Sequence, residues 1–119
     1  MMDINNRIKI LYDGGVIDGK VRDLALKTAA WLSQMGINVE DEKGNMFITH
    51  LAMSFQRIKD GNTVEALEDF IIDELQNNKN YPKAQDFIDF IEKEGKIKLP
   101  ESEKGYILLH ICSLMEKEC

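Results

Sequence analysis

The residues of this chain best suited to chemistry are its two histidines, His50 and His110. Near pH 7 a neutral imidazole nitrogen can bind a metal, move a proton or accept a phosphoryl group. The two histidines are sixty residues apart, so any shared role requires the fold to bring them together. Their chemistry therefore depends on where each ring lies on its own segment.

Most chemistries that use histidine need neighbours that this sequence does not supply. Metal sites often place two histidines at spacings such as HExxH or H-x3-H, and neither occurs here. Cys112 follows His110 by two residues, so on a helix their side chains point to different sides. The triplets DGG and DGK lack the spacing of a phosphate-binding glycine loop. We expect no catalytic residue, no cofactor and no metal. A site built from the histidines and nearby carboxylates stays as an alternative.

Helical periodicity places each histidine at the edge of an apolar face. The face near His50 consists of Phe47, Ile48, Leu51, Phe55 and Ile58. The face near His110 consists of Ile107, Leu108, Ile111, Leu114 and Met115. At about 100° per residue, each histidine lies roughly 110° from the centre of its face. Arg57 follows His50 by seven residues, and His110 lies seven residues from both Glu103 and Lys117. An imidazole at such a boundary can pack one edge and leave a nitrogen open, although a purely structural histidine fits the same position.

The rest of the chain reads as helices joined by short loops, because apolar residues recur at helical spacing between caps, glycines and prolines. The first predicted helix ends at Gly14, the second runs from Asp18 to near Gly36, and the third runs from about Asn45 to Asp60. The fourth is capped by Asn62 or Thr63, the fifth runs from Pro82 to Gly95, and the last begins at Pro100–Glu101. The segments GINVE and GKIKLP are too short and isolated to predict a hairpin. We predict an all-α fold, a compact bundle of five to six helices with no sheet, in a single domain over 1–119.

Composition excludes several classes of partner. The 15 lysines and arginines against 21 aspartates and glutamates give a net charge of −6. A nucleic-acid-binding domain gains affinity by neutralising phosphates, so we expect no direct nucleic-acid contact. No apolar stretch approaches the roughly 20 residues of a membrane-spanning helix, and the N-terminus lacks the layout of a signal peptide. We therefore expect no membrane contact. Two cysteines are too few for a disulfide framework, so we expect a cytoplasmic protein.

Two segments of the chain resemble the signature of a known family. The segment KIKLPESEKGYILLHI (96–111) is similar to one histidine motif of the PTS regulation domain, or PRD. The segment FITHLAMSFQRIKDGN (47–62) resembles the other, and the two motifs have the expected order and spacing. The resemblance covers about 18–117. The PRD occurs in bacterial antiterminators and activators that are controlled by the sugar phosphotransferase system.

This resemblance implies a role for both histidines. By position, His50 and His110 correspond to the two phosphorylatable histidines of the family. Arg57 and Glu103 match polar positions that accompany them, and Lys117 shares a side of the last helix with His110. We therefore expect Arg57, Glu103 and Lys117 to support a phosphate site around the two acceptor rings.

The resemblance also implies partners. It predicts a non-enzymatic regulatory domain that forms a homodimer and receives phosphoryl groups from HPr, from an enzyme IIB, or from both. The phosphorylated state would act on transcription and carbohydrate use through a separate partner. The alternative is an interaction and dimerisation module of the same fold without phosphorylation. Thr49 favours this alternative, because family members often have an acidic residue just before the first histidine.

Overall fold

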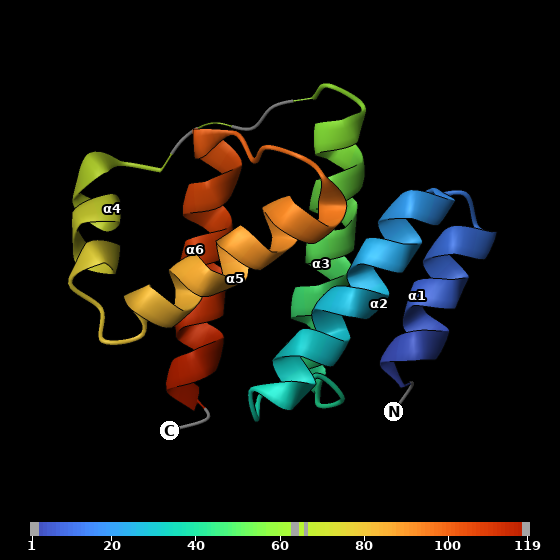
Figure 1. The fold of residues 1–119 in the computed structure, drawn as a ribbon, viewed down its shortest axis with the longest axis horizontal. Coiled ribbons are helices and arrows are strands. Elements are labelled where there is room, and N and C mark those ends of the chain that lie inside the picture. The colour runs from blue at the N-terminus through green and yellow to red at the C-terminus, as the bar shows by residue number, and fades with distance from the viewer. Residues whose placement is uncertain (1–2, 63–64, 66, 118–119) are drawn as a thin grey trace.

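The computed structural model describes residues 3–62, 65 and 67–117, and of Lys117 the backbone only. These residues form six helices and no strand, which confirms the predicted all-α fold without a sheet (Figure 1). The helices are α1 (Ile4–Asp13), α2 (Gly19–Gln34), α3 (Glu42–Lys59), α4 (Asp69–Gln76), α5 (Tyr81–Gly95) and α6 (Glu101–Lys117).

Aspartate side chains cap the first three helices. Asp3 accepts a hydrogen bond from the backbone N–H of the third residue after it, and Asp18 and Asp41 do the same. The predicted cap at Asp18 is therefore confirmed. Helix α3 begins at Glu42, three residues before the predicted Asn45, because Asp41 satisfies an N–H group that the helix cannot pair itself.

The predicted start of the fourth helix is wrong, since α4 begins only at Asp69. The sequence pattern offered Asn62 or Thr63 as its cap, and Thr63 lies outside the described residues. Asn62 instead belongs to the turn that ends α3. Its N–H donates to the carbonyl of Arg57 at 3.0 Å, just after Gly61 adopts a φ of 82°. A glycine in this left-handed conformation commonly ends a helix, so the same residues close α3 rather than open α4.

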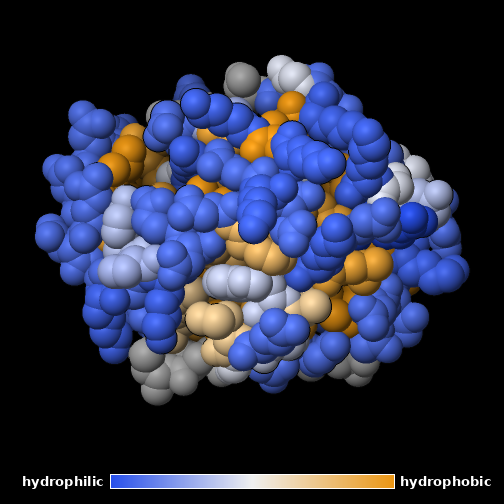
Figure 2. Space-filling view, in the orientation of Figure 1, coloured by the Kyte–Doolittle hydropathy of each residue, from blue (hydrophilic) through white to orange (hydrophobic). Residues whose placement is uncertain are grey.

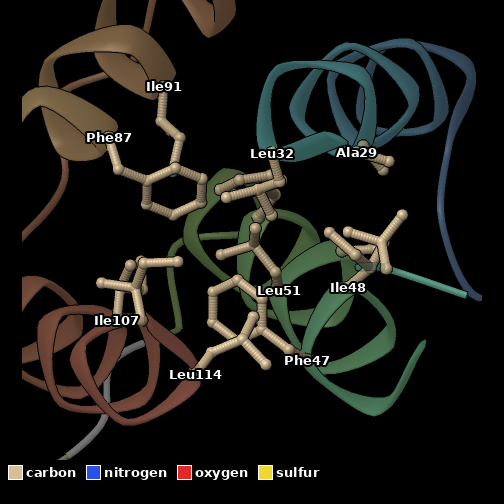
Figure 3. Close-up of a cluster of buried hydrophobic side chains, with 14 of the residues drawn as sticks. Ala29, Leu32, Phe47, Ile48, Leu51, Phe87, Ile91, Ile107 and Leu114 are labelled. Carbon is tan, nitrogen blue, oxygen red and sulfur yellow. The ribbon is translucent and has the colours of Figure 1, made fainter. Parts of the chain in front are cut away.

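The core lies where α2, α3, α5 and α6 meet (Figure 3). Leu32, Leu51, Phe87, Ile91 and Ile107 are all at most 4% exposed there. Fully burying a side chain of this size contributes roughly 1.5–3 kcal/mol relative to leaving it in water. Both predicted apolar faces, on α3 and on α6, point into this core, so the opposite edges of the two helices are left at the surface.

Helices α3 and α6 pack against each other and run in opposite directions (Figure 1). On the face shown in Figure 2, hydrophilic side chains cover most of the surface and apolar ones emerge in small patches between them. No helix in the described ranges is both long and apolar enough to cross a bilayer.

Candidate functional site

A surface cavity of about 660 Å³ lies between α3 and α6, and both histidines line it. His50 reaches it from α3 and His110 from α6, and both side chains are exposed, as their helical positions predicted. The fold therefore unites two residues that are sixty positions apart. The apolar part of the wall consists of Met46, Phe47, Leu51, Met53, Ile107 and Leu114.

His50 is close enough to His110 to influence the charge of the His110 ring. The pKa of His110 lies below its ordinary value of 6.5, chiefly because its ring is partly desolvated against the cavity wall. The charge of His50 lowers the pKa of His110 further. His110 is therefore mostly unprotonated near neutral pH, which is the form that can act as a nucleophile.

We expect His50→Gln to raise the pKa of His110 toward 6.5 without reaching it. The substitution removes the smaller cause of the lowered pKa and leaves desolvation, the larger one, in place. A ring-proton NMR titration measures the pKa directly. Lys27→Gln is the control, because Lys27 is exposed on α2 and does not line the cavity. A His110 pKa that stays the same or falls in His50→Gln would contradict this account.

The same lowered pKa has a defined effect on stability. His110 binds a proton more readily in the unfolded chain than in the folded one. Its contribution to the free energy of unfolding is therefore complete above about pH 6.5 and is lost as the pH falls toward the folded-state pKa.

An ion pair between a half-buried arginine and a buried carboxylate links α3 and α6 at one end of the cavity. Arg57 donates from Nε to one oxygen of Glu103 at 2.9 Å and from Nη2 to the other at 3.0 Å. Nη2 of Arg57 also donates to Oγ of Ser54 at 3.0 Å. The Glu103 side chain is 1% exposed and that of Arg57 is 35% exposed. The hydrogen bonds to Glu103 raise the pKa of Arg57, so the guanidinium stays charged and its charge is largely balanced.

Each member of the ion pair lies seven residues from the histidine on the same helix. Arg57 follows His50 by seven residues, and Glu103 precedes His110 by seven. Seven residues are about two helical turns, or roughly 10.5 Å. Because the helices are antiparallel, the ion pair crosses their interface two turns away from the two rings. The pair therefore holds α3 and α6 in the register that places the rings at one cavity.

The structure adds a residue that the sequence analysis did not identify. Lys43 lines the cavity together with both histidines and Arg57. It precedes His50 by seven residues, so the two-turn spacing that identified the cation after His50 also exists before it. Lys117 ends α6, and its side chain lies outside the described residues, so its predicted role stays a prediction.

In the described part of the chain, no group of three or more histidine, cysteine, aspartate or glutamate side chains is arranged to hold an ion. Cys112 is buried, and burial raises the pKa of its thiol, so the reactive thiolate form is disfavoured.

The chain belongs to the PRD family, because the model of the PRD domain matches residues 29–114. PRDs are regulatory domains, and the family predicted from the two histidine motifs is therefore confirmed. The chain is 24% identical over 112 residues to the uncharacterized protein YhfY of Escherichia coli (strain K12), covering 93% of each chain. It is 28% identical over 94 residues to the transcription antiterminator LicT of Bacillus subtilis (strain 168), covering 77% of this chain and 34% of LicT. No solved structure gives a significant match.

Proposed function

We propose that this PRD accepts phosphoryl groups on His50 and His110 and communicates that state to a partner in transcriptional control. The observation that supports this proposal is the meeting of two exposed imidazoles, from α3 and α6, at one surface cavity. The likeness to LicT, an antiterminator, supports the link to transcription. HPr and an enzyme IIB of the phosphotransferase system are the proposed donors, in the cytoplasm.

The transfer is a simple displacement at phosphorus. An unprotonated ring nitrogen attacks the phosphoryl group of the donor, and a nitrogen–phosphorus bond forms on this chain. The bond between phosphorus and the donor side chain breaks, and its electron pair returns to the donor. The lowered pKa of His110 favours this attack because it keeps the nucleophilic nitrogen free of a proton.

The same surface is our proposed homodimer contact. Met46 and Met53 line the cavity and are 50% and 43% exposed, so the site has an apolar rim that a second copy can cover. A phosphoryl group adds about 1.5–2 negative charges at pH 7. Placing that charge beside an apolar rim changes the free energy of association, which is how phosphorylation would reach the partner.

Labelling with phosphate from phosphoenolpyruvate tests this function. Enzyme I and HPr, with and without a cognate enzyme IIB, are expected to label the wild type on histidine. His50→Gln and His110→Gln should each lower the label, and the double variant should lose it. All three variants should unfold at the wild-type temperature, because both rings are at the surface. An unlabelled wild type, or a label that survives in the double variant, contradicts the proposal.

An interaction module without phosphorylation is the second candidate, and Thr49 is the observation that favours it. Thr49 provides no carboxylate beside His50, and its hydroxyl donates to the carbonyl of Asn45 at 2.8 Å. In this case the two histidine variants would bind the partner as the wild type does, and the labelling experiment would give no signal.

A further inference from the structure

We propose that Lys43 binds the phosphoryl group in the cavity and stabilises the phosphorylated state. This inference rests on the proposed function, and it concerns the cation that meets the transferred group. A phosphoryl group on a histidine carries close to two negative charges near neutral pH, so it needs a positive charge that is not already neutralised.

Two cationic side chains line the cavity, and they differ in whether a carboxylate already pairs with them. Arg57 makes two hydrogen bonds to Glu103 and one to Ser54, so its charge is already balanced by a carboxylate. Lys43 is exposed, and within the described part of the chain it takes part in none of the ion pairs. Lys43 therefore supplies the uncompensated positive charge of the described cavity wall.

The position of Lys43 in its helix supports a role outside the helix. It lies in the first turn of α3, directly after Glu42. The N-terminal end of a helix carries a partial positive charge, so a cation in the first turn is typically unfavourable by about 0.3–1 kcal/mol. Lys43 therefore does not serve the stability of α3, whereas a negative charge in the cavity would compensate it.

The geometry allows Lys43 to meet a phosphoryl group on the histidine pair. Lys43 and His50 share a helix face and are about two turns, or roughly 10.5 Å, apart along the axis. Lysine carries its ammonium group on a flexible four-carbon stem, and a phosphoryl group extends from the ring. Since both side chains line one cavity, the ammonium group of Lys43 can approach a phosphoryl group on His50 across that cavity.

The equilibrium constant of phosphoryl transfer from HPr measures this contact. At equilibrium, phosphoryl groups pass in both directions between HPr and this chain, and a residue that only helps the donor to dock changes the rate without changing the equilibrium. We expect Lys43→Gln to lower the equilibrium ratio of phosphorylated to free protein by about threefold to fivefold, the size of an exposed ion pair. Lys43→Arg should keep most of the wild-type ratio, because it keeps the charge.

Lys27→Gln is the matched control, because it removes one exposed lysine from a helix away from the cavity. It should leave the ratio unchanged. Added salt should lower the ratio for the wild type toward that of Lys43→Gln and affect Lys43→Gln much less, because salt screens an exposed pair. Thermal unfolding should show Lys43→Gln to be at least as stable as the wild type.

Three results would overturn the role of Lys43. They are a wild-type ratio in Lys43→Gln, a ratio in Lys43→Arg as low as in Lys43→Gln, and an equal fall in Lys27→Gln. Failure of the proposed function itself looks different, because then no phosphoryl group reaches even the wild type.

Discussion

Replacing Arg57 by methionine is expected to lower the free energy of unfolding by about 2–3 kcal/mol. The substitution leaves the carboxylate of Glu103, which is 1% exposed, without its two guanidinium hydrogen bonds. A buried charge that loses its partner retains the cost of its desolvation. Replacing one member of such a pair therefore lowers the free energy of unfolding more than replacing both members does. Arg57 is itself 35% exposed, so we expect a loss at or just below the bottom of the range of about 3–5 kcal/mol for breaking fully buried pairs.

Urea denaturation of a set of variants tests this explanation. Arg57→Met combined with Glu103→Met should be more stable than Arg57→Met alone, because no unpaired buried charge is left. Arg22→Met is the matched control. Arg22 is also 35% exposed, but its partner Asp23 is 60% exposed, so the loss should stay below about 1 kcal/mol. Equal losses at Arg57 and Arg22 would show that the buried carboxylate is not the cause.

Replacing Gly44 by alanine is expected to destabilise the protein by about 3 kcal/mol. A Cβ atom at Gly44 would lie 2.3 Å from the carbonyl oxygen of Asn38 and 2.6 Å from the Cα of Val39. Both atoms belong to the backbone of the connection before α3, so the clash cannot be relieved by turning a side chain. The connection or the first turn of α3 must move, which would also strain the cap between Asp41 and the N–H of Gly44 at 2.7 Å.

Gly19→Ala is the matched control for this prediction. Gly19 also lies in the first turn of a helix, and its Cβ would have no neighbour closer than 3.7 Å. We expect this variant to lie within about 0.5 kcal/mol of the wild type or to be slightly more stable, since alanine reduces the entropy of the unfolded chain. Urea denaturation measures both variants. If Gly44→Ala and Gly19→Ala are equally stable, the close approach of the backbone to α3 does not constrain the fold.

Much of the fold was predictable because each helix carries its own local signals. Periodicity placed the apolar faces of α3 and α6 correctly, and with them the surface positions of His50 and His110. The predicted start of α4 is wrong because Asn62 has the chemistry of a cap but belongs to the turn that ends α3. Cap residues identify a helix end, and only tertiary packing decides which helix they belong to.

The candidate site was predictable only in part, because its pieces meet across two helices. The sequence identifies Arg57 and Glu103 separately as polar residues that accompany the two histidines, yet nothing in it shows that they bind each other. Their pairing depends on the antiparallel register of α3 and α6, which is a property of the packed fold. Lys43 was missed for a related reason, since its importance appears only when the charge of Arg57 is seen to be balanced by Glu103.

The matching intervals of seven residues, from His50 to Arg57 and from Glu103 to His110, limit how this domain can vary among relatives. One residue inserted into either interval would turn the rest of that helix by about 100° and advance it by about 1.5 Å. The ion pair and the two rings could then no longer both face the opposite helix. Substitutions at positions of these two intervals that face away from the core are therefore tolerable, whereas a change in the length of either interval is not. Gaps in comparisons of such domains should fall outside them.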